Sequence, residues 1–296
     1  MSTLRPTALD RRPRPRGATA DLWRKRAGDA LRWAVVVFFL IVSLFPAVYM
    51  VLVSLMTSQQ MFGAQLFPWP PNWANFVDAW VSARIGVLYW NSIYISSTSV
   101  LLTLVVCAPA GYGLARVKFL GRGLLFNFLL LGLTLPVSTS LLPLFFNLKT
   151  FGLLNTPLAL IGPYTGFGIS FGVFILKGFF ETLPMEMEEA ARVDGANEFR
   201  IFAQVMLPLT RPALATVSIF LFLTNWNEFI FALTFITEPL MRTLPTGIYS
   251  LAGQEFYGNY PTLAAALVIF SVPVVVLYFL FQSQFIEVLT AGAVKQ

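Results

Sequence analysis

The apolar run Trp33–Leu55, which reads WAVVVFFLIVSLFPAVYMVLVSL, establishes the fold class. It contains no charged residue, and a bilayer core requires about 20 mostly apolar residues in helical form. Five more runs of similar character follow it along the chain. We therefore predict an all-α membrane protein with six transmembrane helices. The predicted spans are residues 33–55, 92–113, 124–146, 158–176, 213–236 and 263–286.

Two of these spans need comment. The third, residues 124–146, is interrupted by Pro136 and Pro143, with hydroxyl-bearing residues between them. Membrane helices tolerate such breaks because neighbouring helices can satisfy the freed carbonyls. The first span follows a basic region of residues 1–32, and no small-residue cleavage site comes after it. It is predicted to be an uncleaved anchor rather than a signal peptide.

The composition argues against most enzyme and soluble classes. The 296 residues are 57% hydrophobic and 11% charged, whereas soluble domains carry about 25% charged residues. Cys107 is the one cysteine and histidine is absent. An intrachain disulfide is excluded, and the commonest metal ligand and general base is missing. We predict no metal site, no catalytic residue and no enzyme activity.

The placement of Lys and Arg orients the spans, because cytoplasmic loops carry an excess of these residues. With the N-terminus inside, seventeen of the twenty fall on the cytoplasmic side, and only Arg84, Lys149 and Arg242 fall outside. Both termini and the loop 177–212 are therefore predicted to be cytoplasmic. The net charge of +6 is then a topology signal, and no nucleic-acid partner is expected. The tail 1–32 is predicted to be partly disordered, and residues 287–296 form a cytoplasmic C-tail.

The loop 177–212 contains a charged segment, Glu189-Ala190-Ala191-Arg192-Val193-Asp194-Gly195-Ala196, followed by Leu207-Pro208. Thr182 is a candidate N-cap for a short helix, and Gly195 can adopt the left-handed conformation that ends one. Asn197 is expected to cap a second short helix, which ends at Pro208. The segment is therefore predicted to be two short helices with a sharp bend at Gly195.

One face of the first short helix is suited to a protein partner. Met187, Ala190, Ala191 and Asp194 share this face at helical spacing, and the two alanines leave a low surface. The alternative is an interfacial helix that lies on the lipid headgroups. Such helices favour Lys and Arg on their polar face, whereas residues 181–189 contain four acids. A docking helix is therefore the preferred interpretation.

This segment resembles the EAA loop of the permease subunits of bacterial ATP-binding-cassette importers. The pattern is Glu-Ala-Ala, three residues, Gly, nine residues, Ile, one residue and Leu-Pro. The matching residues are Glu189, Ala190, Ala191, Gly195, Leu207 and Pro208. Val205 stands at the Ile position, which is a mild departure.

Other motifs resemble sugar permeases of the second, maltose-type subunit over about residues 30–296. Val288 departs from the usual Gly in the C-terminal tail. The motifs are Asn91-Ser92, Gly111–Arg122, Gly152–Thr156, Trp226-Asn227-Glu228-Phe229 and Thr290–Lys295.

The resemblance implies a type I importer permease fold in the bacterial inner membrane and a role in ATP-driven import of carbohydrate. Its implied partners are a sister permease, two ATPase subunits and an extracytoplasmic sugar-binding protein. ATP and Mg²⁺ would bind the ATPase, and this chain lacks a Gly-x-x-x-x-Gly-Lys-Ser/Thr loop. The implied ATPase-coupling residues are Glu189, Ala190, Ala191, Asp194, Gly195, Leu207 and Pro208.

Glu228 is the one acid predicted to lie deep within a span, where an unpaired charge costs about 2.5–3.5 kcal/mol or more. Ser218, Asn225 and Glu228 form a polar stripe at helical spacing. The stripe is either a buried, hydrogen-bonded packing cluster or part of the transport pathway. Trp226 and the adjacent Asn227 belong to the same candidate site, and Trp226 could stack on a sugar ring or simply pack.

Two long outer loops are rich in aromatic residues. Residues 57–91 have the character of an interfacial belt or of a partner contact. The loop 237–261 resembles the family's loop that reaches toward the docked binding protein. Its candidate contact residues are Gln254, Glu255, Phe256, Tyr257 and Tyr260.

Three rival functions remain on sequence grounds. A permease for another solute, such as polyamine, glycerol phosphate, phosphate or an amino acid, would share the EAA loop. A secondary carrier would require coupling-ion sites and inverted repeats, and a single deep acid argues against it. A membrane enzyme is disfavoured by the lack of histidine. No motif in the sequence identifies the sugar.

Overall fold

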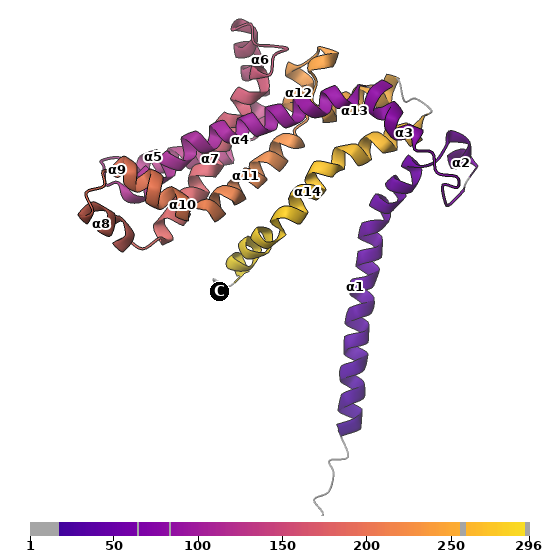
Figure 1. Cartoon of the computed structure of the whole chain (residues 1–296), viewed down its shortest axis with the longest axis horizontal. Helices are drawn as coiled ribbons and strands as arrows, with labels where there is room; N and C mark the ends of the chain where they lie inside the picture. The colour runs from indigo at the N-terminus through magenta and orange to yellow at the C-terminus, as the bar shows by residue number, and fades with distance from the viewer. Residues whose placement is uncertain (1–17, 64, 83, 255–258, 294–296) are drawn as a thin grey trace, which may run out of the picture. The chain divides into compact units, whose positions relative to one another are not determined.

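The computed structural model describes residues 18–63, 65–82, 84–254 and 259–293, and all of their regular structure is helical (Figure 1). The chain divides into two compact units, Met1–Val51 and Leu52–Gln296. The first unit holds most of α1, Ala18–Ser54, whose segment Gly28–Ser54 is apolar and long enough to cross a membrane. This helix covers nearly all of the predicted first span.

The second unit consists of helices of very different lengths. The long ones are α4, α7, α11 and α14, and short α, 3₁₀ and π turns connect them. Its elements are α2 Ser58–Phe62, α3 Ala74–Val77, the π turn η1 Asp78–Ser82, α4 Ile85–Arg116, α5 Arg122–Thr134, the 3₁₀ turn η2 Val137–Ser140, α6 Leu141–Thr150, α7 Leu158–Thr182, α8 Glu186–Val193, α9 Glu198–Arg200, the π turn η3 Ile201–Met206, α10 Leu207–Leu209, α11 Arg211–Trp226, α12 Ile230–Phe235, the 3₁₀ turn η4 Pro239–Met241, α13 Leu244–Gln254 and α14 Tyr260–Ala293.

The all-α prediction is confirmed for the described residues. Among them, α1, α4, α7 and α14 contain stretches long and apolar enough to span a membrane. Two bent helix pairs also pass this test when each is counted as one span, which brings the total to as many as six. The six-span count and the cytoplasmic position of both termini stay predictions.

The third predicted span is broken where proline interrupts it. α5 ends at Thr134, and the segment Val137–Thr150 leaves at an angle of 93°. Leu135 is extended, with ψ 121°, because the residue before a proline is disfavoured in helical conformation. Pro136 also lacks the N–H that a continuous helix would use. Residues 124–146 therefore do not form one straight helix.

The fifth predicted span, residues 213–236, is also not one helix, which corrects the sequence-based boundary. α11 ends at Trp226, residues 227–229 are not helical, and α12 starts at Ile230. The carboxylate of Glu228 accepts hydrogen bonds from the N–H groups of Phe231 and Ala232. By accepting these N–H groups, Glu228 stabilises the start of a new helix, α12. This favours a break after Trp226 over continuation of α11.

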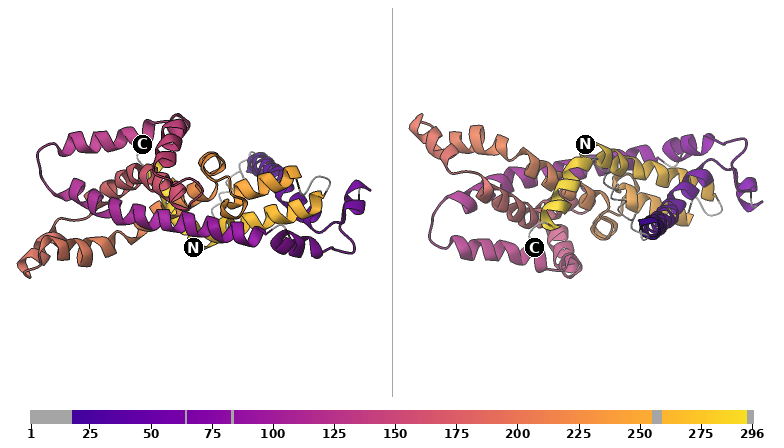
Figure 2. Two further views of the ribbon diagram at one scale, coloured as in Figure 1. Left: turned by 90° about the horizontal axis from the view of Figure 1, so that it is seen from above. Right: turned by 90° about the horizontal axis from the view of Figure 1, so that it is seen from below.

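The centre of the second unit is the close packing of α4 against α7. A Cβ at Gly172 would lie 2.6 Å from Sγ of Cys107, and one at Gly111 would lie 3.1 Å from Cβ of Leu176. Small residues allow helix backbones to approach closely, which is how helices associate in lipid. Figures 1 and 2 show α8 and α9 near one end of α4, and α13 near its other end.

Candidate coupling surface and transport pathway

The short helix α8 has charges that suit its direction. Glu186, Glu188 and Glu189 occupy its first turn and Arg192 its last, where the helix dipole favours negative and positive charge respectively. Gly195 follows the helix with φ +82°, and the N–H of Ala196 bonds back to the carbonyl of Ala191. This is the glycine-ended turn expected from the sequence.

The predicted start of α8 is wrong. α7 continues through Thr182, whose hydroxyl donates to the carbonyl of Phe179 instead of capping a new helix. The break falls at Leu183, which is extended because it precedes Pro184. Met185 is the N-cap residue, and its side chain makes no capping bond. The covalent link between α7 and α8 is thus a short segment around a proline.

The second short helix begins as predicted and continues slightly further. The side chain of Asn197 accepts the N–H of Arg200 at 2.8 Å, so it caps α9. The chain then widens into the π turn Ile201–Met206 before α10 ends at Leu209. Pro208 cannot donate a backbone hydrogen bond, and its ring crowds the preceding turn, which accounts for the wider winding next to it.

The predicted coupling residues lie mainly on the outer surface of this loop. Glu189, Ala190, Asp194 and Gly195 are exposed. The other predicted residues, Ala191, Leu207 and Pro208, are half-buried. The former can contact another protein, whereas the latter hold the loop against the membrane helices.

The sequence-based prediction did not include three exposed apolar side chains of this loop. Val193 is 88% exposed, Phe199 is 77% exposed and Met185 is also exposed, beside the predicted Met187. These side chains add apolar area to a loop that is otherwise charged.

A buried ion pair lies beneath the coupling surface, and no pattern in the sequence predicts it. Nε of Arg116 is 3.0 Å from Oε1 of Glu188, and the Glu188 side chain is only 2% exposed. Nη2 of Arg116 also donates to the carbonyls of Phe180 and Leu183, near the end of α7. Arg116 belongs to a motif noted in the sequence, but its partner could be found only from the packing of α8.

The ion pair continues into an exposed chain of charges. Arg192 lies 3.7 Å from Glu188 and donates to both carboxylate oxygens of Glu198, at 2.9 and 3.2 Å. These hydrogen bonds from Arg192 lower the pKa of Glu198. This row of charged side chains connects α8 to the start of α9 across the bend at Gly195. A separate cluster joins Glu181 to Lys177 and Arg122.

Glu228 is held by groups of this chain. The hydroxyl of Tyr164 donates to its Oε2 at 2.6 Å, and the N–H of Phe231 donates to its Oε1 at 2.8 Å. Because α11 ends at Trp226, the predicted stripe does not reach Glu228 along a continuous helix. Both oxygens of the carboxylate have partners, as the packing interpretation requires.

The other candidate pathway residues do not converge on one site. The indole of Trp226 is 1% exposed and stacks on Phe222 and Phe270, so it is enclosed by side chains of this chain. Asn225 is buried, and the exposed Asn227 donates to the carbonyl of Leu223. Ser218 lines a cavity of about 360 Å³ between α4, α11 and α14.

The predicted contact with a binding protein falls largely where the structure gives no description. Glu255, Phe256 and Tyr257 lie outside the described residues, and Gln254 ends α13. Tyr260 begins α14, is exposed, and has its ring 6.2 Å from that of Phe62. This contact joins the two aromatic-rich loops, residues 57–91 and 237–261, that the sequence predicts to be outer loops.

Two asparagines of the sequence motifs fasten the segment after α12. Oδ1 of Asn155 accepts the N–H groups of Thr237 and Glu238, at 2.6 and 3.0 Å. Nδ2 of Asn91 donates to the carbonyls of Leu240 and Arg242. Both motifs thus hold one loop against the ends of helices far away in the sequence.

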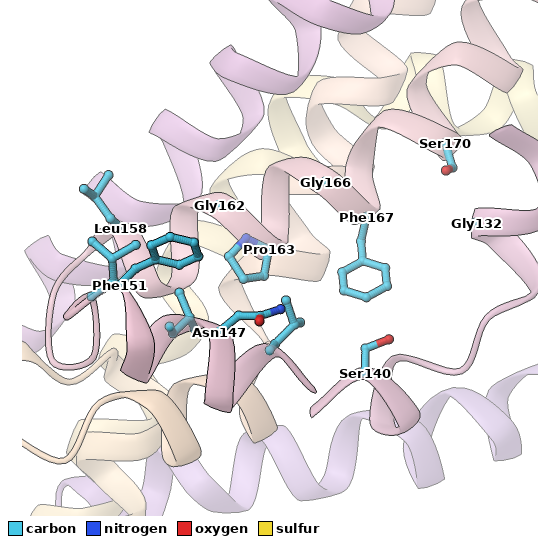
Figure 3. Close-up of a pocket in the computed structure, with 13 residues that line it drawn as sticks. Gly132, Ser140, Asn147, Phe151, Leu158, Gly162, Pro163, Gly166, Phe167 and Ser170 are labelled. Atoms are coloured by element: carbon cyan, nitrogen blue, oxygen red, sulfur yellow. The ribbon is translucent and has the colours of Figure 1, made fainter. Parts of the chain in front are cut away.

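The larger of the two cavities described lies between α7 and the broken pair α5–α6. Its volume is about 540 Å³. Figure 3 shows the ring of Phe167 extending from α7 toward Ser140, and Ser170 near Gly132. Asn147 and Phe151 contribute from α6 and the residue that follows it. The break at Pro136 places η2 across from α7 and so opens this space.

These features define a class: an α-helical membrane protein with a charged, exposed loop at one end of its long helices. The model of the family described as "binding-protein-dependent transport system inner membrane component" matches residues 107–286. The chain belongs to this family. Its members are permease subunits of transporters, not catalytic enzymes. The match confirms the family that the EAA loop predicts.

The chain is similar over most of its length to curated proteins. It is 36% identical to the diacetylchitobiose uptake system permease protein NgcG of Streptomyces coelicolor, over 90% of this chain and 87% of that protein. It is 35% identical to the sulfoquinovosyl glycerol transport system permease protein SmoH of Agrobacterium fabrum, over 91% and 95%. It is 33% identical to the trehalose/maltose transport system permease protein MalG of Thermococcus litoralis, over 86% and 92%.

Solved structures show a shared fold. A chain of a bacterial ABC transporter involved in the import of the acidic polysaccharide alginate superimposes with a TM-score of 0.77. The identity is 21%, and the match covers 88% of this chain and 97% of that chain. The expected importer permease fold is thereby confirmed.

Proposed function

We propose that this chain is one membrane-spanning subunit of an ATP-driven, binding-protein-dependent importer of carbohydrates, with di- and oligosaccharides as the substrate class. Family membership supports a transport role, and the three similar permeases are named for glycoside or sugar uptake. The observation that carries the coupling role is the exposed face of α8, where Glu189, Ala190 and Gly195 are accessible to a partner.

The proposal assigns energy conversion to other chains. A phosphate-binding Gly-x-x-x-x-Gly-Lys-Ser/Thr loop is absent from the sequence, so ATP and Mg²⁺ would bind two separate ATPase subunits. A sister permease would complete the pathway, and an extracytoplasmic sugar-binding protein would deliver the substrate. The whole complex would lie in the bacterial cytoplasmic membrane, with α8 on the cytoplasmic side.

In this scheme the exposed face of α8 receives the motion of the ATPase. Ala190 and Gly195 allow close approach, Glu189 and Asp194 make polar contacts, and the exposed Val193 and Phe199 add apolar area. ATP binding would draw this loop toward the loop of the sister permease. The membrane helices would follow this motion and open the pathway to one side of the membrane and then to the other. ATP and the docked binding protein would drive this change, because they bind the inward-open and outward-open states with different affinity.

The cavity between α5, α6 and α7 is the part of this chain that we propose lines the sugar pathway. Its volume of about 540 Å³ lies within the range of about 300–1,000 Å³ typical of small-molecule sites. Phe167 and Phe151 offer aromatic surface for the apolar face of a sugar, and Ser140, Asn147 and Ser170 offer hydrogen bonds. This assignment differs from the Ser218–Glu228 stripe, in which Trp226 is buried and Glu228 lies beyond the end of α11 with its carboxylate bonded within the chain.

The decisive experiment is reconstitution. The tagged chain is purified with the subunits that accompany it, placed in proteoliposomes, and tested against a panel of labelled di- and oligosaccharides with the binding protein outside and ATP inside. We expect uptake that requires both ATP and the binding protein. Polyamines and glycerol phosphate serve as the comparison substrates.

The outcomes separate the rival functions. Uptake of a polyamine or glycerol phosphate, with no sugar transported, would replace the proposed substrate class while keeping the importer. Uptake that persists without ATP and follows an ion gradient would indicate a secondary carrier and overturn the proposal.

A further inference from the structure

Arg116 lies where three helices meet. It is in the last turn of α4, and its side chain is 9% exposed. One nitrogen, Nη2, donates to the carbonyls of Phe180 and Leu183 near the end of α7, and another, Nε, pairs with Glu188 of α8 at 3.0 Å. A single guanidinium therefore contacts the ends of α4, α7 and α8. Its planar, rigid set of donors suits several partners at once.

The covalent connection of α8 to the membrane helices is weak by comparison. Leu183 is extended and Pro184 follows it, so α8 is joined to α7 through a link without helical hydrogen bonds. Beyond α8, Gly195 has φ +82°, and the chain bends again by 72° between Leu209 and Arg211. With links like these on both sides, side-chain contacts must determine how rigidly α8 follows the membrane helices.

Glu188 is the side chain of α8 that makes an ion pair with α4, in addition to the apolar packing of Ala191. It is buried, whereas Glu186 and Glu189 on the same helix are exposed. A buried carboxylate that keeps its charge needs a charged partner, and removal of one member leaves the other unpaired. The buried pair is therefore costly to break, unlike the exposed pairs of Glu181.

We infer that the Arg116–Glu188 ion pair is a positioning clamp that makes α8 move as one body with α4 and α7. The inference rests on the proposed function, since it concerns how motion of an ATPase reaches the membrane helices. α4 and α7 pack closely through Gly111 and Gly172, so a force on α8 would reach the centre of the second unit directly. Without the clamp, α8 would turn at Leu183–Pro184 and the force would be lost there.

The test replaces Glu188 in the assembled complex. Glu188→Gln keeps the shape of the side chain and removes its charge. Glu181→Gln is the matched control, because it makes the same change at an exposed ion pair at the end of α7. ATP hydrolysis and sugar uptake are both measured in proteoliposomes, and the amount of assembled complex is measured by size-exclusion chromatography.

We expect Glu188→Gln to lower the sugar taken up per ATP hydrolysed by at least about fivefold, the lower end of typical coupling between sites. Basal ATP hydrolysis per assembled complex should stay within about twofold of the native value, and Glu181→Gln should leave the ratio unchanged. A residue with a merely structural role would lower hydrolysis and uptake together. An unchanged ratio in Glu188→Gln overturns the clamp.

A second readout reports the position of α8 directly. Spin labels are attached at Glu186→Cys in α8, outside the proposed docking residues, and at Leu120→Cys in the connection after α4, both exposed positions. Cys107, the one native cysteine, is buried and so is protected from labelling. In the assembled complex we expect a narrow distance distribution that broadens in Glu188→Gln. An unchanged width contradicts the clamp.

Two further arms keep the result interpretable. If Glu188→Gln does not assemble, the same measurements are made on Arg116→Lys, which retains the positive charge near the end of α7. Parallel loss of uptake and hydrolysis in that variant assigns the pair to folding and overturns the inference. Failure of the native complex to import sugar with ATP would instead overturn the proposed function, so the two failures are distinct.

Discussion

The hydroxyl of Tyr164 in α7 donates a hydrogen bond of 2.6 Å to Glu228, in the break between α11 and α12. The same carboxylate accepts the N–H groups of Phe231 and Ala232. One acid thus starts α12 and ties it to α7. Within the apolar part of a membrane protein such an arrangement satisfies a charge that would otherwise be costly.

Replacement of Tyr164 by Phe should weaken this junction. The carboxylate of Glu228 would lose one of its partners, and hydrogen bonds to charged groups stabilise by about 1.5–3 kcal/mol. We expect a lower midpoint of thermal unfolding for Tyr164→Phe in detergent, measured by fluorescence. Tyr249→Phe, at an exposed tyrosine, should leave the midpoint unchanged.

Glu228→Gln separates the two interpretations of this acid. If the carboxylate only organises α12, the variant lowers stability and leaves the sugar dependence of transport unchanged. We expect this result, because partners within the chain already satisfy both oxygens. A changed apparent affinity for sugar, with normal assembly, would show that Glu228 lines the pathway.

A substitution at Gly195 tests the coupling surface. Gly195→Asp places a side chain at φ +82°, where the left-handed conformation costs about 1–2 kcal/mol, and adds charge to the docking face. We expect uptake to be lost while the chain still inserts, as measured by proteoliposome transport and by immunoblot of membranes. Gly178→Asp is the control, at an exposed glycine of α7 where an added Cβ would meet no atom within 4 Å, and it is expected to retain uptake.

The α4–α7 interface predicts a steric effect. A Cβ at Gly172 would lie 2.6 Å from Sγ and 3.0 Å from Cβ of Cys107. Gly172→Ala should therefore destabilise the chain by about 1–3 kcal/mol, as overpacking does. Gly113→Ala meets nothing within 4 Å and should have little effect. Addition of Cys107→Ala should restore part of the loss, and thermal unfolding of the three variants measures it.

The exposed pair Arg192–Glu198 predicts a pH effect at the bend between α8 and α9. The pKa of Glu198 is lowered by hydrogen bonds from Arg192. Its stabilising contribution is thus present above the unfolded-state pKa and lost as pH falls through the folded-state pKa. Glu198→Gln should speed amide exchange of residues 194–200 at neutral pH by at most about fivefold, since exposed pairs stabilise by about 0.2–1 kcal/mol.

The measurement for this pair is hydrogen exchange of the native chain and Glu198→Gln over a range of pH. Because exchange chemistry itself varies with pH, the quantity of interest is the ratio of the two rates. The ratio should approach one in acid, where Glu198 is protonated. A ratio that stays constant down to acidic pH would show that the charge of Glu198 does not stabilise the bend.

Local patterns in the sequence determine much of the secondary structure. The length and apolar character of the runs predict helices in lipid, because a backbone without water must satisfy its own hydrogen bonds. The sequence predicts Gly195 as a helix end and Asn197 as a helix cap, and both are confirmed, since these roles depend on a few adjacent residues. The prediction that Thr182 caps a new helix is wrong, because α7 continues through Thr182, past the predicted end of the span at residue 176.

The class of protein and the position of the charged loop between α7 and α11 therefore follow from the sequence alone. The partner of Arg116, the packing of Trp226 and the break at Glu228 depend on the fold. Each involves groups brought together from separate helices. A charged or aromatic residue looks the same in the sequence whether its side chain contacts another residue or solvent. Only the packing of the helices determines which of the two it contacts.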